Sequence, residues 1–77
     1  MNDTFDFVVT LHRPETDTKI RWIEQFNPVN TATGQFYTQQ EFGEQLLPYV
    51  NGLRPKFPDF HVYISLATNE EIQELAA

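Results

Sequence analysis

Two stretches of this chain alternate apolar and polar residues with a period of two, the pattern of a β-strand that buries one face. They span residues 4–12 and 60–67, and a third such stretch spans residues 19–26. All three therefore predict strands. The side chains expected to face inward are Phe5, Phe7, Val9 and Leu11 in the first strand, Ile20, Trp22 and Phe26 in the second, and Phe60, Val62, Ile64 and Leu66 in the last.

The segments around these strands carry turn residues. Residues 13–18 are polar and contain Pro14, which suits a hairpin loop between the first two strands. Residues 27–34 are expected to form a loop, and residues 35–37 a further short strand. The chain therefore supplies three or four strands.

A helix start is the most specific local signal. Thr38 and Glu41 have the spacing of a capping box, and Tyr37 and Phe42 have that of a hydrophobic staple. The helix that begins there is amphipathic. The side chains expected on its apolar stripe are Phe42, Leu46, Tyr49, Val50 and Leu53.

Proline and glycine shape the rest of this helix. Pro48 removes the amide that would bond the Glu44 carbonyl, so we expect a kink there. Asn51 and Gly52 are expected to end the helix in a left-handed conformation. A second capping box, Thr68 with Glu71, predicts a short C-terminal helix.

These elements predict an α+β fold of order ββ(β)αβα in a single small globular domain, residues 1–77. A small antiparallel or mixed sheet of three to four strands carries one kinked amphipathic helix on one face, and a short C-terminal helix follows. A right-handed crossover places the last strand beside the first, which gives the order second, first, last.

The opposite face of this sheet is expected to lack a helix. If His12 pairs with Lys19 and with His61, alternation places the outward side chains in three rows. The rows are Lys19, His12 and His61; Arg21, Thr10 and Tyr63; and Ile23, Val8 and Ser65.

Composition limits the function classes. The net charge is −6 at pH 7, which opposes nonspecific attraction to nucleic acid or anionic lipid and favours a basic partner. The chain has no cysteine, residues 1–4 lack the start of a signal peptide, and no window has the length of a membrane span. We therefore expect a cytoplasmic protein that does not enter membranes.

Catalysis and metal binding have little sequence support. His12 and His61 would face each other on the sheet, but two exposed strand histidines are the simpler interpretation. No phosphate-loop, nucleophile-elbow or metal-helix motif is present. We expect no enzyme activity, no cofactor and no metal.

Protein binding is the favoured function. The last strand would be an edge strand without proline, lysine or fixed charge, and such edges commonly pair with a partner strand or with a second copy. At the level of class alone, the chain is similar to small acidic phage or mobile-element proteins that inhibit host nucleic-acid enzymes by occupying their basic grooves. The carboxylates that would contact a basic partner are Glu41, Glu44, Glu70, Glu71 and Glu74.

Three alternatives remain open. The outward sheet face, with Arg21, His61, Tyr63 and Ser65, is a second candidate surface for a protein partner. A nucleic-acid platform would use Arg21, Lys19 and Tyr63, but the overall charge does not favour direct nucleic-acid binding. A small adaptor or subunit that dimerises through its last strand would share the same features.

Overall fold

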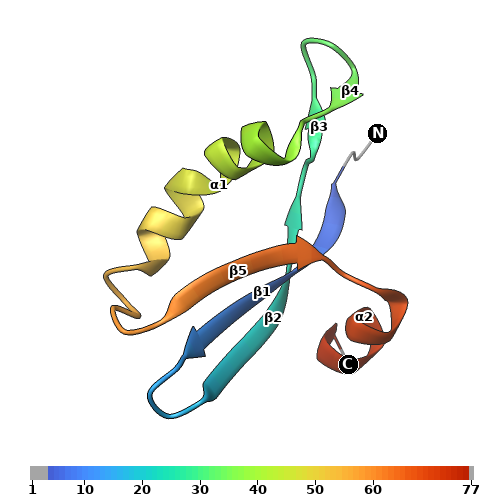
Figure 1. The fold of residues 1–77 in the computed structure, drawn as a ribbon. Helices are drawn as coiled ribbons and strands as arrows, with labels where there is room; N and C mark the ends of the chain where they lie inside the picture. Colours follow the sequence, from blue (N-terminus) through green and yellow to red (C-terminus); the bar gives the residue numbers. More distant parts are fainter. Residues whose placement is uncertain (1–3, 77) are drawn as a thin grey trace.

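The computed structural model describes residues 4–76 and confirms the predicted α+β class (Figure 1). Two helices and five strands are present in this range, in the expected order. They are β1 (Phe5–Arg13), β2 (Thr18–Phe26), β3 (Val29–Asn30), β4 (Gln35–Phe36), α1 (Gln39–Leu53), β5 (His61–Leu66) and α2 (Asn69–Ala76).

The main sheet has the predicted order β2-β1-β5, with both pairs antiparallel. The predicted register is also confirmed, because His12 lies opposite Lys19 on β2 and opposite His61 on β5. Since β1 is the central strand, it contributes all four fully buried apolar residues of the described chain. These are Phe7, Val8, Val9 and Leu11.

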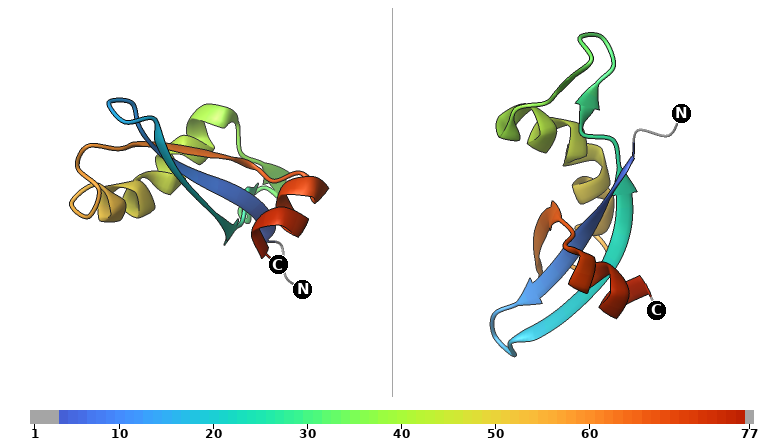
Figure 2. Two further views of the ribbon diagram at one scale, coloured as in Figure 1. Left: turned by 90° about the horizontal axis from the view of Figure 1, so that it is seen from below. Right: turned by 90° about the vertical axis from the view of Figure 1, so that its right-hand side faces the viewer.

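The two faces of this sheet are covered by different helices. The face with Phe7, Val9 and Leu11, here called the α1 face, packs on α1 through aromatic contacts. Phe7 lies 5.3 Å from Phe42, and Phe26 lies 5.0 Å from Tyr49, between ring centroids. The opposite face, here called the α2 face, carries α2 over β2. Figure 2 shows the two helices on opposite sides of the sheet.

The expected loop at residues 27–34 is wrong in part, because β3 lies within it and pairs with β4. The turn between them is closed by the Gly34 amide, which donates to the Asn30 carbonyl at 2.8 Å. Gly34 has a φ of 73°, a conformation that glycine adopts without strain. The β3–β4 hairpin projects away from the main sheet at the top of Figure 1.

The start of α1 follows its sequence signals. Both hydrogen bonds of the capping box form: the Glu41 amide donates to the Thr38 hydroxyl at 3.2 Å, and the Thr38 amide donates to Glu41 Oε1 at 3.0 Å. Tyr37 stacks on Phe42 at 6.5 Å, which completes the staple. The second box, Thr68 with Glu71, forms in the same way at the start of α2.

The predicted end of α1 is wrong. The helix continues through Asn51 and Gly52 to Leu53, and neither residue has a positive φ. The Arg54 and Phe57 amides then donate to the Val50 and Leu53 carbonyls, so a tight helical turn replaces the left-handed stop. Pro48 lies inside the continuous helix, and the kink remains a prediction.

The molecule is extended for its size. Its radius of gyration is 13.6 Å, whereas a compact chain of this length has a radius of about 11.5 Å. No residue of α1 is fully buried, and Ile20 and Leu66, which were expected to face inward, are 39% and 58% exposed. The single helix is too narrow to cover the whole α1 face, and apolar surface remains open at its margins.

Replacing Thr38 with Ala is expected to lower the free energy of unfolding by about 1 kcal/mol, because the helix loses its N-cap acceptor. The cap also lowers the pKa of Glu41 below its ordinary 4.5, through the hydrogen bond that its carboxylate accepts from the Thr38 amide. A lowered carboxyl pKa stabilises the fold above pH 4.5, and this contribution is lost as the pH falls through the folded value.

Urea unfolding at pH 7 and pH 3 measures both effects. The matched control is Glu41→Gln, which keeps an acceptor at the same place but cannot titrate. The stability difference between the native protein and Glu41→Gln should diminish at pH 3. A Thr38→Ala protein as stable as the native one at pH 7 would contradict the assigned cap.

Candidate protein-binding surfaces

The outward rows predicted from the sequence are present. Thr10 lies between Arg21 and Tyr63, and Val8 lies between Ile23 and Ser65. Tyr63 is 56% exposed, and His61 and Ser65 are exposed beside it on β5. The outward residues of β5 are therefore exposed as predicted.

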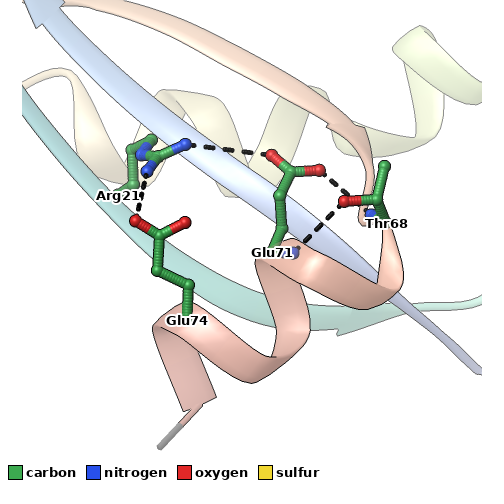
Figure 3. A network of polar contacts seen from close by, with 4 residues as sticks. All are labelled: Arg21, Thr68, Glu71 and Glu74. Atoms are coloured by element: carbon green, nitrogen blue, oxygen red, sulfur yellow. Dashed lines mark hydrogen bonds and ion pairs between the residues drawn. The ribbon is translucent and has the colours of Figure 1, made fainter.

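α2 packs against part of the β2 half of this face, so the expectation of a helix-free face is wrong, although Lys19 and Arg21 are still exposed. Arg21 pairs with two carboxylates of α2 (Figure 3): its Nη1 lies 3.9 Å from Glu71 Oε2, and its Nη2 lies 3.7 Å from Glu74 Oε1. Glu71 also caps α2 through its other oxygen. Val8, expected to face outward, is only 2% exposed. Arg21 therefore anchors α2 on β2, a role that sequence reasoning missed.

The sequence does contain a signal for this anchor. Glu71 and Glu74 are three residues apart, which places both carboxylates on one side of a helix. A single outward arginine on a neighbouring strand then suits both of them. From the sequence alone, both carboxylates are expected on a free acidic surface, because nothing in the alternation pattern shows where a terminal helix returns to the sheet.

The five candidate carboxylates do not form one surface. Glu41 and Glu44 lie on α1, and Glu70, Glu71 and Glu74 lie on α2, on the other side of the sheet (Figure 2). Two of the α2 carboxylates are paired with Arg21, and Glu41 is engaged in the cap. Within residues 4–76, Glu44 and Glu70 are exposed and make no ion pair, so they carry the uncompensated charge of their helices.

An apolar groove, here called the hairpin groove, opens between β1, β5, the β3–β4 hairpin and the first turn of α1. Its volume is about 270 Å³. The groove exposes three large apolar side chains: Phe5 at 41%, Phe36 at 66% and Leu66 at 58%. Phe7 and Phe42 form its base on the core side. The sequence could not reveal it, because it depends on where the β3–β4 hairpin lies.

A second hollow, here called the edge cavity, lies between the end of α1 and the free edge of β5. Its volume is about 560 Å³. The apolar part of its wall includes Val50, Phe57 and Val62, and Arg54 brings a positive charge. Arg54 makes no ion pair in the part of the chain that the structure describes. The edge cavity therefore offers an apolar wall beside an unpaired cation.

The two histidines lie opposite each other but have different surroundings. His12 Nε2 lies 2.9 Å from Asp17 Oδ1, and this hydrogen bond lowers the pKa of Asp17. Asp17 has a positive φ of 52° in the β1–β2 turn, which the hydrogen bond helps to hold. Among residues 4–76, no three acidic, histidine or cysteine side chains are grouped to bind a metal ion. The contact between His12 and Asp17 fits a hydrogen bond that stabilises the β1–β2 turn.

The fold thus defines a small α+β protein with exposed apolar margins. No protein-family model, curated protein or solved structure matches this chain significantly. Neither described helix combines the length and the apolar character needed to cross a bilayer. The function of this chain must therefore be inferred from its exposed surfaces.

Proposed function

We propose that this protein is a non-enzymatic protein-binding module that docks a partner with a basic surface at the hairpin groove. The observation that supports it is the exposure of Phe5, Phe36 and Leu66 around one cavity. Clusters of exposed apolar side chains on a soluble surface typically mark interaction sites. Aromatic side chains in such clusters often dominate binding energy.

Charge defines the chemistry of this partner. The chain carries −6 overall, and the groove wall includes Thr38 and Gln39 from the first turn of α1. Glu41 in the first turn of α1 lies beside the groove, because its carboxylate accepts a hydrogen bond from the Thr38 amide, whereas Glu44 is exposed further along the helix. A complementary partner presents an apolar side chain surrounded by lysine and arginine. Opposite charge of this kind speeds association and excludes acidic partners.

A narrower form of the proposal is a small acidic inhibitor of phage type that occupies the basic surface of a nucleic-acid-binding enzyme. The overall charge supports it, and a cytoplasmic location belongs to it. The alternative, direct nucleic-acid binding through Arg21, Lys19 and Tyr63, receives less support. Arg21 is held by Glu71 and Glu74 under α2, where phosphate would have to displace two carboxylates.

The proposal is tested with two substitutions on the full chain. Phe36→Lys places a charge in the hairpin groove, and Glu44→Lys reverses an exposed charge on α1 that is not engaged in the cap. Proteins that the native chain retains from a cell extract are compared with those retained by each variant, and binding to a purified candidate is then measured. We expect Phe36→Lys to weaken binding about 30-fold, as loss of an aromatic hot spot does. Glu44→Lys should slow association, and added salt should have the same effect.

Matched controls make the same chemical changes elsewhere. Leu47→Lys alters a side chain that is 47% exposed on α1 outside the groove wall, and Glu15→Lys reverses a charge in the β1–β2 turn. Both controls should bind as the native chain does. A partner whose affinity is indifferent to Phe36→Lys, to Glu44→Lys and to salt would overturn the proposal.

A further inference from the structure

The free edge of β5 is defined by the hydrogen bonds on its other side. The Ala67 amide donates to the Asp6 carbonyl at 3.0 Å, in line with the β1–β5 register. Hydrogen-bonded and non-hydrogen-bonded pairs alternate along an antiparallel ladder. The backbone groups of His61, Tyr63 and Ser65 therefore bond to β1. Those of Val62, Ile64 and Leu66 point outward.

No described residue satisfies these outward groups. Within residues 4–76, β5 has β1 as its one strand neighbour, and no hydrogen bond outside the sheet reaches the backbone of Val62, Ile64 or Leu66. The other edge differs, because β2 carries Lys19 and Arg21 and is contacted by α2. Charged residues and covering elements are the usual protection of a sheet edge. β5 has neither.

We propose that β5 pairs in antiparallel fashion with β5 of a second copy, about a two-fold axis that passes beside Tyr63. The two three-stranded sheets then become one six-stranded sheet. Because the backbone groups of Val62, Ile64 and Leu66 point outward, these residues must pair with residues of the same set in the other copy. Val62 then lies opposite Ile64 of the other copy. Tyr63 then lies opposite Tyr63 of the other copy in a non-hydrogen-bonded pair, and cross-strand aromatic pairs of this kind stabilise sheets. This inference does not rest on the proposed function, although Leu66 contributes to both surfaces.

The same register fills the edge cavity. Leu66 of the second copy comes to lie opposite Phe60, with its side chain on the α1 face. The edge cavity lies there, with Val50, Phe57 and Val62 in its wall. A side chain that is 58% exposed in the single chain thereby gains an apolar site. Phe5 and Phe36 stay outside this pairing.

Charge at the two ends of β5 favours a second copy over an unrelated strand. Arg54 and Lys56 precede β5, and Glu70 follows it; none of the three makes an ion pair among the described residues. An antiparallel two-fold pair brings the basic beginning of each β5 to the acidic end of the other. The two-fold axis places this attraction between opposite charges at both ends of the strand pair, although each chain carries a net charge of −6.

The exposed surface of the chain is also large enough for a dimer interface. The accessible surface of the chain is 5747 Å², roughly 900 Å² more than a folded monomer of 9.0 kDa normally exposes. A standard interface buries about 800 Å² on each partner. Dimerisation would return the exposed surface of this chain to the usual range for its size.

Sedimentation equilibrium on the full chain tests the proposal. At about 0.1 mM chain, even a dimer with a dissociation constant near 10 µM is largely formed, so we expect twice the mass of the 9.0 kDa chain. Tyr63→Lys places two positive charges directly opposite each other and should raise the dissociation constant at least about tenfold. Tyr63→Phe should keep the dimer. A single-chain mass, or a dimer insensitive to Tyr63→Lys, overturns the proposal.

Cross-linking tests the register without relying on a destabilised variant. The chain contains no cysteine, so one introduced cysteine can form a disulfide only with the same cysteine of another copy. Tyr63→Cys should form a disulfide-linked dimer under mild oxidation, because opposed residues in a non-hydrogen-bonded pair are within bonding range. Ser65→Cys is the control, since its two copies would be roughly 13 Å apart. Absence of a link at Tyr63→Cys, or an equal link at Ser65→Cys, contradicts the axis.

Discussion

Replacing Phe7 with Ala is expected to lower the free energy of unfolding by about 3–5 kcal/mol. Phe7 is 6% exposed on the central strand, and its ring contacts Phe26 at 5.7 Å and Phe42 at 5.3 Å, between centroids. It therefore joins β1, β2 and α1 in one aromatic cluster. The substitution removes this ring and leaves a cavity that a sheet between two helices cannot close.

Urea unfolding, followed by circular dichroism, measures this loss. The matched control is Phe36→Ala, the same chemical change at a ring that is 66% exposed, which should cost less than about 1 kcal/mol. A small domain has a total stability of only about 5–10 kcal/mol, so the Phe7 variant should be partly unfolded at 37 °C. Equal stability of the two variants would show that Phe7 does not lie in the core.

The sheet could be predicted from the sequence because its signals are long and redundant. Each of its strands shows a period of two, and a one-residue slip would turn Phe7 and Val9 toward the opposite face. Once His12 is placed opposite Lys19 and His61, alternation fixes every other pair. The helix starts were predictable for a related reason. A capping box joins residues only three positions apart, so it needs no tertiary information.

Features set by long-range packing could not be predicted in the same way. β3 has two residues, too few to show a period, and it lies in the segment expected to be a loop, whereas β4 lies within the short strand predicted at residues 35–37. Gly52 remains helical because Leu53 and Phe57 continue the turn, although an Asn-Gly pair normally favours a left-handed stop. The candidate site residues show the same difference between features set by local pattern and features set by long-range packing. Tyr63 and Ser65 are exposed as alternation predicts, whereas Arg21 pairs with carboxylates of a helix whose path the local sequence does not encode.

The pairing of Arg21 with α2 changes which surface is favoured for binding. A five-carboxylate surface would have allowed binding by charge alone. With Glu71 and Glu74 paired to Arg21, the uncompensated carboxylates are fewer and lie on two sides of the sheet. Exposed apolar surface is the stronger feature, because it follows from the narrow cover that α1 provides. Charge then selects the partner, and the hairpin groove supplies most of the binding energy in this proposal.

Replacing Trp22 with Ala is expected to lower the free energy of unfolding by about 3 kcal/mol, at the lower end for a large aromatic ring because Trp22 is only half-buried. The indole joins β2 to α1 by a shared donor: Nε1 lies 3.1 Å from Glu24 Oε1 and 3.3 Å from the Tyr49 hydroxyl. Its removal opens a cavity under α1 and leaves the half-buried Glu24 carboxylate without this donor, so packing and polar satisfaction are lost together.

Trp22→Phe separates these two contributions. It keeps most of the apolar volume and removes only the indole N–H, so it should cost about 1 kcal/mol. Unfolding of both variants in urea at pH 7 gives the difference, which is the energy of ring packing between β2 and α1. If Trp22→Phe is as damaging as Trp22→Ala, the hydrogen bond to Glu24 and Tyr49 holds α1 on the sheet. If both are neutral, the ring contacts of Phe7 with Phe42 and of Phe26 with Tyr49 are sufficient to hold α1 on the sheet.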